Sequence, residues 1–382
     1  MQTAPGKAGL VLAGGGARAA YQVGVLQALK EMLPDPAANP FPIIAGTSAG
    51  AVNAGALACH ADDFGRAVDN LLDVWRNFEP RHVYRADFAG VAANSSRWIA
   101  GLLFGAFVRD RRTSLLDNRP LAALLGRKLE FGRIAGNIAK GSLDAVAVTC
   151  SGYTSGQSVS FFEGAPHIAG WKRSQRVGLR TRLGVEHLMA SAAIPFLFPA
   201  WHVNREYFGD GSMRQIAPVS PALHLGADRV LVVGTGRQTA DGARARSNIY
   251  PSLAQIAGHA LNSIFLDSLM VDIERLERIN RTVELIPPDA LAANSIALRP
   301  IKVLFISPSQ PIERIAARFL HELPRSVRFI LRPTGAISRS GSNLASYLLF
   351  EEPFCRALID LGYQDTASRE KEVRDFFDGI AL

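Results

Sequence analysis

Residues 43–58 read Ile-Ile-Ala-Gly-Thr-Ser-Ala-Gly-Ala-Val-Asn-Ala-Gly-Ala-Leu-Ala, and this stretch decides the fold. Its apolar beginning is typical of a buried strand, and its alanine-rich end is typical of a helix that runs to about His60. At the turn between them lies a Gly-x-Ser-x-Gly pattern, Gly46-Thr47-Ser48-Ala49-Gly50. Such a turn holds the serine hydroxyl clear of the sheet, and small neighbours let the backbone turn sharply. The stretch therefore predicts a nucleophile, Ser48; a tight turn that only caps a helix is the alternative.

The same strand-loop-helix order stands immediately before it. Residues 10–12 are an apolar run, three glycines follow, and residues 18–32 have apolar side chains at helical spacing. Further strands are expected at 145–149, 159–162, 229–233 and 302–306, and further helices at 185–193, 253–279 and 343–361. The alternation predicts a three-layer α/β/α fold with a mostly parallel central sheet.

The composition narrows the class of protein. The 382 residues are 48% hydrophobic and 20% charged, which suits one large domain or a domain with an extension. The net charge of +8 suits an anionic partner, but the lysines and arginines are scattered and no nucleic-acid-binding signature occurs, so no nucleic acid is expected. Cys59, Cys150 and Cys355 lie far apart, which argues against a disulfide framework or a zinc site and favours a reducing compartment. No metal and no cofactor are expected.

A serine hydroxyl needs a base to act as a nucleophile at neutral pH. The chain has eight histidines, and none stands in an obvious triad context. Asp210 is the other candidate, because it lies between Gly209 and Gly211 directly after a strand-like segment. Flanking glycines would let this carboxylate approach another part of the backbone closely, although a turn aspartate has the same local pattern.

The glycine run Gly14-Gly15-Gly16 has two interpretations. With Ala19 it matches a dinucleotide-binding fingerprint, and Asp35 stands at about the distance of the ribose-binding acid. Alternatively, its backbone N–H groups form an oxyanion hole beside Ser48. Asp35 lies in a Pro-Asp-Pro turn rather than at a strand end, which counts against the dinucleotide, and no Gly-Lys-Ser/Thr is present for a Walker-type loop.

Taken in order, these motifs resemble the patatin-like phospholipases, lipid acyl hydrolases that use a Ser-Asp dyad without histidine. The resemblance rests on residues 14–18 (Gly-Gly-Gly-Ala-Arg), 46–50 (Gly-Thr-Ser-Ala-Gly), 190–195 (Ala-Ser-Ala-Ala-Ile-Pro) and 210–211 (Asp-Gly). It implies that Ser48 is the nucleophile and that Asp210 activates first the serine and later water. It also implies that Gly14, Gly15 and Gly16 supply the oxyanion hole, with support from the following motif residues: Arg18, Gly46, Gly50 and Gly211. The sequence departs from the family at Ala19, usually glycine, and at Ser212, usually glycine or alanine.

The resemblance covers roughly residues 9–233. It implies an acyl hydrolase domain at 7–235, and a C-terminal extension at 236–382 that partly completes the same domain. The implied activity is cleavage of carboxylic esters through an acyl-enzyme, as by a phospholipase A or lysophospholipase; galactolipid, triacylglycerol and simple acyl esters are other candidate substrates. The rival classes are a nucleotide-binding α/β protein and a non-catalytic, lipid-binding member of the fold.

One segment suits contact with membrane or micellar lipid. Residues 98–108 are apolar with an aromatic edge, and Arg109, Arg111 and Arg112 follow. Residues 98–112 are therefore expected to touch an anionic membrane surface, or else to pack over the core. Glycines interrupt the apolar run after Lys7, and no window holds about 18 uninterrupted apolar residues, so neither a signal peptide nor a transmembrane helix is expected. We expect a cytoplasmic protein with peripheral contact at a membrane.

Overall fold

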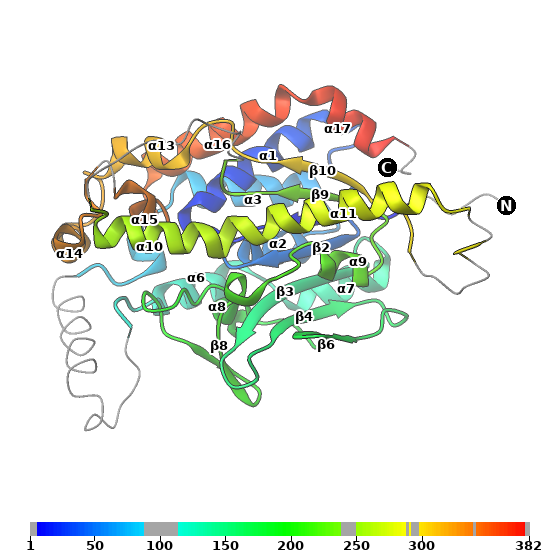
Figure 1. Ribbon diagram of the computed structural model, residues 1–382, viewed down its shortest axis with the longest axis horizontal. Helices are drawn as coiled ribbons and strands as arrows, with labels where there is room; N and C mark the ends of the chain where they lie inside the picture. The colour runs from blue at the N-terminus through cyan, green and yellow to red at the C-terminus, as the bar shows by residue number, and fades with distance from the viewer. Residues whose placement is uncertain are drawn as a thin grey trace.

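The computed structural model describes residues 6–87, 114–237, 250–287, 290–291, 298–338 and 341–378, and all structural statements refer to these ranges (Figure 1). A mixed sheet forms the middle layer, and helices cover both of its faces (Figure 1). The expected three-layer α/β/α fold with a mostly parallel sheet is confirmed. The expected segment 98–112 falls outside the described residues.

Five parallel strands form the centre of the sheet. In spatial order they are β10 (Lys302–Ile306), β9 (Arg229–Val233), β1 (Ala8–Leu12), β2 (Ile43–Thr47) and β3 (Ala145–Gly152). The sheet continues with β4 (Ser158–Gly164), antiparallel to β3, then β6 (Arg176–Arg180) and β5 (Trp171–Arg173). A side branch, β8 (Glu206–Asp210) with β7 (Trp201–Val203), pairs antiparallel to the end of β3. The carboxyl ends of β1 and β2 therefore meet at one edge, close to the end of β8.

Alternate residues of the central strands enter two separate cores. In β1, Leu10 and Leu12 join the larger core, whereas Val11 joins the smaller one. Because both faces are covered, all five residues of β1 and of β2 are buried. This explains why these strands are continuous apolar runs rather than alternating ones.

Helices on the larger core bring the N-terminal and C-terminal parts of the chain together. The 3-10 turn η1 (Gly16–Ala19) leads into α1 (Ala20–Met32), which packs along α16 (Glu352–Ala367). The other elements around this core and the strand ends are α2 (Ala49–Cys59), α3 (Phe64–Arg76), α4 (Pro80–Val83), α6 (Arg119–Lys128), α7 (Gly132–Lys140), α8 (Val185–Ser191), η2 (Gly211–Arg214), α13 (Ile312–Phe319), α14 (Arg325–Leu331), η4 (Arg332–Thr334), α15 (Ser342–Ser346) and α17 (Glu370–Phe377). The region 236–382 thus adds β10 to the sheet and α16 to a helix layer, while the division at residue 235 stays a prediction.

The opposite face carries α9 (Ser220–His224) and the second half of one long helix, which is built from α10 (Leu253–Asn262), the π-turn η3 (Ser263–Asp267) and α11 (Ser268–Glu284). The first half of this helix packs on the larger core, through Ala254 and Phe265. Among the described helices, Leu253–Glu284 has the length and hydropathy of a membrane span, with 28% of its apolar window buried. Its second half places Leu269, Ile273 and Leu276 in the smaller core. Core helices of soluble proteins can have the same length and hydropathy as a membrane span, so these two properties are weak evidence that Leu253–Glu284 crosses a membrane.

The prediction of one helix over 343–361 is wrong. The chain forms α15 and α16, with an interruption between Tyr347 and Glu351. Pro353 lies in the first turn of α16, where its missing N–H costs no hydrogen bond, but a continuous helix would have required that N–H. The interruption directs the carbonyl of Tyr347 toward the glycine run, where it accepts a hydrogen bond of 3.1 Å from the Ala17 N–H.

Candidate active site

Ser48 lies at the sharp turn between β2 and α2. Its backbone has φ of 55° and ψ of −130°, a conformation that residues with a side chain rarely adopt, and its side chain is buried, with 1% exposed. Gly50 makes the turn possible, because a Cβ at this position would lie 2.3 Å from the Leu12 carbonyl oxygen. The start of α2 can therefore rest against the end of β1, which brings Ser48 next to the glycine run.

Ser191 fixes the turn from the other side. Its hydroxyl accepts a hydrogen bond of 2.8 Å from the Ser48 N–H and donates one of 2.6 Å to the Thr149 carbonyl. The side chain comes from the end of α8 and is fully buried. The sequence marked this residue only as part of the segment 190–195; the serine's role in fixing the turn has no local signal.

Asp210 ends β8 and is fully buried beside the end of β3. Its Oδ1 accepts a hydrogen bond of 2.9 Å from the Ser212 N–H. Burial raises the pKa of the Asp210 carboxyl to about 6, although hydrogen bonding by Ser48 and Ser212 acts in the opposite direction. The carboxylate is thus less stable than one in water, and it is a stronger base.

Ser48 and Asp210 are brought together, but their contact is loose. The Ser48 hydroxyl is close enough to lower the Asp210 pKa. Oδ2 of Asp210 is nevertheless buried without a hydrogen-bond partner among the described residues. An unpaired buried oxygen is costly, and a rotation of the Ser48 side chain would let its hydroxyl satisfy Oδ2.

The glycine run follows β1 and opens onto the same cavity as Ser48. Gly16 has φ of 56°, and a Cβ there would lie 2.4 Å from the Tyr347 carbonyl oxygen. The Gly14 carbonyl is occupied, since it accepts a hydrogen bond of 2.5 Å from the Thr235 hydroxyl. The N–H groups of Gly14, Gly15 and Gly16 donate to no acceptor within the described ranges, and Gly16 itself lines the cavity. They are available to bind an oxyanion.

Arg18 anchors the glycine run to the C-terminal part of the chain. The side chain is 1% exposed, and its guanidinium lies 4.0 Å from the centre of the Tyr347 ring. It donates hydrogen bonds to Ser346 Oγ at 2.8 Å, to Asn262 Oδ1 at 3.2 Å, and to Asn343. These acceptors are neutral, so the buried cation is held by dipoles and a ring rather than by a carboxylate.

An apolar cavity of about 290 Å³ leads away from Ser48. Four residues of its lining recur every fourth position along α2: Ser48, Val52, Ala56 and His60. The opposite wall comes from α3 and α6, with Leu71, Trp75, Leu121 and Leu125 among its apolar side chains. The cavity thus runs beneath α3 and α6, which cover α2 at this point.

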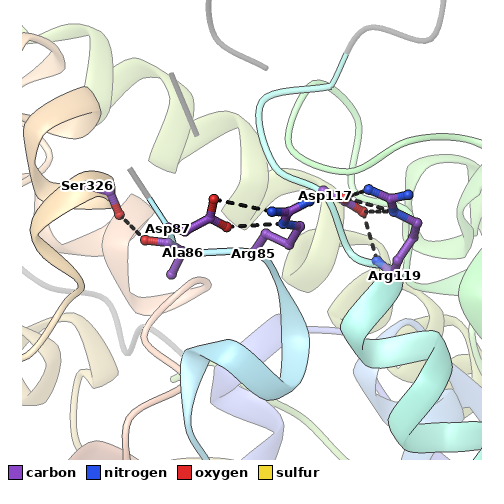
Figure 2. A network of polar contacts seen from close by, with 6 residues as sticks. All are labelled: Arg85, Ala86, Asp87, Asp117, Arg119 and Ser326. Carbon is purple, nitrogen blue, oxygen red and sulfur yellow. Dashed lines mark hydrogen bonds and ion pairs between the residues drawn. The ribbon is translucent and has the colours of Figure 1, made fainter. Parts of the chain in front are cut away.

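A polar network next to the cavity holds the start of α6 (Figure 2). Arg85, two residues after the cavity-lining Val83, donates its N–H to the Asp117 carbonyl at 2.9 Å. Asp117 in turn pairs with Arg119, the first residue of α6. The network is completed by the Arg85–Asp87 ion pair and by a hydrogen bond of 2.6 Å from the Ser326 hydroxyl to the Ala86 carbonyl. It joins α4, α6 and α14 on both sides of residues 88–113.

The other sequence candidates lie away from the Ser48 turn. His60 lines the cavity at the far end of α2, and no histidine of the described chain bonds to Ser48 or Asp210. Asp35 caps an exposed turn after α1 by accepting from the Ala37 N–H at 2.9 Å. The 13 residues of α1 separate Asp35 from the glycine run by about 20 Å. An acid at that place does not reach a ligand held by Gly14–Gly16.

One family model and one solved structure relate this chain to known proteins. A family model described as patatin-like phospholipase matches residues 10–223, more than half of the chain. A comparison with curated proteins gives no match. Among solved structures, the crystal structure of VipD from Legionella pneumophila is similar at 14% identity and a TM-score of 0.32, over 94% of this chain and 67% of that one.

Proposed function

Because this chain belongs to the patatin-like phospholipase family, we propose that it hydrolyses lipid carboxylic esters with Ser48 as nucleophile and Asp210 as base. The observation that carries the assignment is the fully buried Asp210 carboxylate beside Ser48, with its pKa raised to about 6. A base with a pKa near the working pH is largely deprotonated and still accepts a proton readily.

The first half of the reaction forms an acyl-enzyme. The Asp210 carboxylate takes the proton of the Ser48 hydroxyl while Oγ bonds to the ester carbonyl carbon, and the carbonyl π electrons move onto oxygen. The unpaired N–H groups of Gly14, Gly15 and Gly16 bind this oxyanion, together with the positive end of the α2 dipole. The tetrahedral intermediate collapses, the bond to the alkoxy oxygen breaks, and the proton on Asp210 passes to the departing alcohol.

The second half returns the free enzyme. Asp210 takes a proton from water, whose oxygen attacks the acyl carbon through the same oxyanion geometry. Collapse breaks the bond to Ser48 Oγ, which recovers the proton, and releases the fatty acid. Because one carboxylate serves both halves, no histidine is needed.

Two alternatives are weaker. A nucleotide-binding protein would need an acid near the glycine run, and Asp35 lies at the other end of α1. A non-catalytic, lipid-binding member would be expected to lack the serine or the aspartate, and this chain has both.

Ester hydrolysis and active-site labelling test the assignment. We expect Ser48→Ala and Asp210→Asn to lower kcat by at least about 10³-fold, and a fluorophosphonate probe to label the wild type but not Ser48→Ala. His60→Ala and His187→Ala are the controls and should keep their activity. Undiminished hydrolysis in either dyad variant, or collapse in one histidine variant, would overturn the assignment.

A further inference from the structure

We propose that the cavity behind Ser48 binds the acyl chain of the substrate in extended form along α2, so that this helix measures the chain's length. The proposal rests on the function proposed above and adds to it a substrate class, esters of straight-chain acids of up to about 14 carbons. It is carried by the placement of the cavity lining on one helix face, and by the change from apolar to polar residues along it.

The floor of the cavity is a single stripe of α2. Positions that differ by four lie on the same face of a helix, and Ser48, Val52, Ala56 and His60 have this spacing. Val52 and Ala56 are small, so the backbone of α2 lies close to the cavity over its whole length. Each step of four residues turns about 40° round the helix, so a chain attached at Ser48 can follow α2 along a slowly winding path.

The walls of the first part of the cavity are apolar. Leu71 and Trp75 of α3 face Leu121 and Leu125 of α6, and each of these four side chains is buried. Methylene groups placed between them leave water, which is the main source of affinity for an acyl chain. At the Ser48 end the lining adds Ile194 and Phe198, so the apolar surface begins at the nucleophile.

The far end has the opposite character. There the lining includes His60, Arg66 at the start of α3, and Lys128 and Glu130 at the end of α6. The side chains of Arg66 and Lys128 are exposed, and Nδ1 of His60 is buried without a hydrogen-bond partner in the described chain. A methylene that reaches these groups gains no apolar contact and hinders their hydration. The favourable part of the cavity therefore ends at His60.

The length of the apolar part follows from helix geometry. From Ser48 to His60, at about 1.5 Å per residue, α2 rises about 18 Å. An extended hydrocarbon chain advances about 1.25 Å per carbon, since a C–C bond is about 1.52 Å and the bond angle about 111°. About 14 carbons therefore span the distance to His60, about 10 the distance to Ala56, and about 5 the distance to Val52.

Chain-length profiles of two variants test this directly. With p-nitrophenyl esters of about 4 to about 18 carbons, the wild-type kcat/KM should rise by up to about fourfold per methylene until about 14 carbons and then stay level. Ala56→Phe should move the end of the rise to about 10 carbons, and Val52→Phe should move it to about 5. Ala123→Phe places the same ring on the exposed side of α6, and should keep the wild-type profile.

The shortest ester separates folding from specificity. In both cavity variants, kcat/KM for the butyryl ester should fall much less than kcat/KM for the ester of about 14 carbons, since the short chain ends before either ring, whereas Ala123→Phe should keep the wild-type ratio of the two values. Should Ala56→Phe fail to fold, Ala56→Leu should give the same shift in direction. A wild type without ester hydrolysis would contradict the proposed function itself. If the wild type is active and both cavity variants keep its chain-length profile, the proposed function stands, but α2 does not measure the length of the acyl chain.

Discussion

The hydroxyl of Ser191 accepts a hydrogen bond of 2.8 Å from the backbone N–H of Ser48, and thereby ties the end of α8 to the turn that holds the proposed nucleophile. Ser48 has φ of 55°, and a residue with a side chain keeps such a conformation only where its surroundings hold it, at a cost of about 1–3 kcal/mol. Ser191 helps to keep Ser48 in this conformation, because its hydroxyl also donates a hydrogen bond to the Thr149 carbonyl of β3 and so links the turn to that strand. The Ser48 turn is thus fixed by β2, β3 and the end of α8 together.

Removal of this hydroxyl should affect both stability and rate. Ser191→Ala leaves the Ser48 N–H and the Thr149 carbonyl unpaired in a buried site, so the free energy of unfolding should fall by about 1–3 kcal/mol. We expect kcat to fall by about 10-fold or more as the turn relaxes, with little change in KM, because misplacement of a reacting group is costly. Urea denaturation and steady-state kinetics measure the two effects.

Ser160→Ala is the matched control. Its hydroxyl is also buried and also contacts Thr149, through the side chain at 3.0 Å, but it does not touch Ser48. It should change stability without a comparable loss of kcat. A stably folded Ser191→Ala enzyme with wild-type kcat would show that the hydrogen bond does not position the nucleophile.

The pH dependence of hydrolysis should follow Asp210. The carboxyl must be deprotonated to accept the Ser48 proton, and burial raises its pKa to about 6. The value of kcat/KM should therefore fall tenfold per pH unit below about 6 and be level above it. Glu351 provides the control, because burial also raises its pKa, to about 7, and it stands at the start of α16. Glu351→Gln should keep the fall of kcat/KM at low pH. If that fall disappears in Glu351→Gln, it arises from Glu351 and not from Asp210.

The same pKa predicts that the base destabilises the fold. Because the folded-state pKa of Asp210, about 6, lies above its ordinary value of 3.8, the folded protein binds a proton more tightly than the unfolded chain. The contribution of Asp210 to the free energy of unfolding is fully present below about pH 4 and is lost as the pH rises through about 6. Asp210→Asn cannot ionise, so above pH 7 it should be more stable than the wild type, by up to about 3 kcal/mol. Urea unfolding at pH 8 and at pH 4.5 would test this: a gain that does not shrink at the lower pH contradicts the linkage.

The sequence predicted the parts of the site that have a local signal. Ser48 follows a buried strand and precedes a helix, and Asp210 stands between glycines at a strand end; both patterns span only a few residues. Ser191 acts across 143 positions, and the contacts of Arg18 with Asn262 and Ser346 span 244 and 328. No short pattern records such contacts. The apolar spacing of 343–361 predicts one helix, but the structure has an interruption after Ser346. Pro353 and the hydrogen bond from the Ala17 N–H to the Tyr347 carbonyl favour this interruption, and the second of these is again a contact between distant residues.

The contacts of Arg18 predict that the C-terminal part of the chain affects kcat, because it holds the glycine run in place. The guanidinium bonds to Ser346, Asn343 and Asn262 while it stacks on Tyr347, and the Tyr347 carbonyl accepts from the Ala17 N–H. Lysine has a single ammonium in place of the planar fork, so Arg18→Lys cannot make these contacts together. The glycine run should then lose its fixed orientation, and kcat should fall by about 10² or more, in the range seen for loss of one oxyanion donor.

Two readouts distinguish a disordered oxyanion hole from general loss of structure. In Arg18→Lys, the rate of fluorophosphonate labelling of Ser48 should fall in parallel with kcat/KM, because both reactions need an oxyanion to be bound. Tyr347→Phe keeps the ring and the backbone carbonyl and loses only the hydroxyl bond of 2.8 Å to Asn262, so it should retain most of the labelling rate. Tyr347→Leu removes the ring and should resemble Arg18→Lys. If Arg18→Lys folds with wild-type stability and labels at the wild-type rate, the glycine run keeps its orientation without this anchor, and the C-terminal part has no share in the reaction.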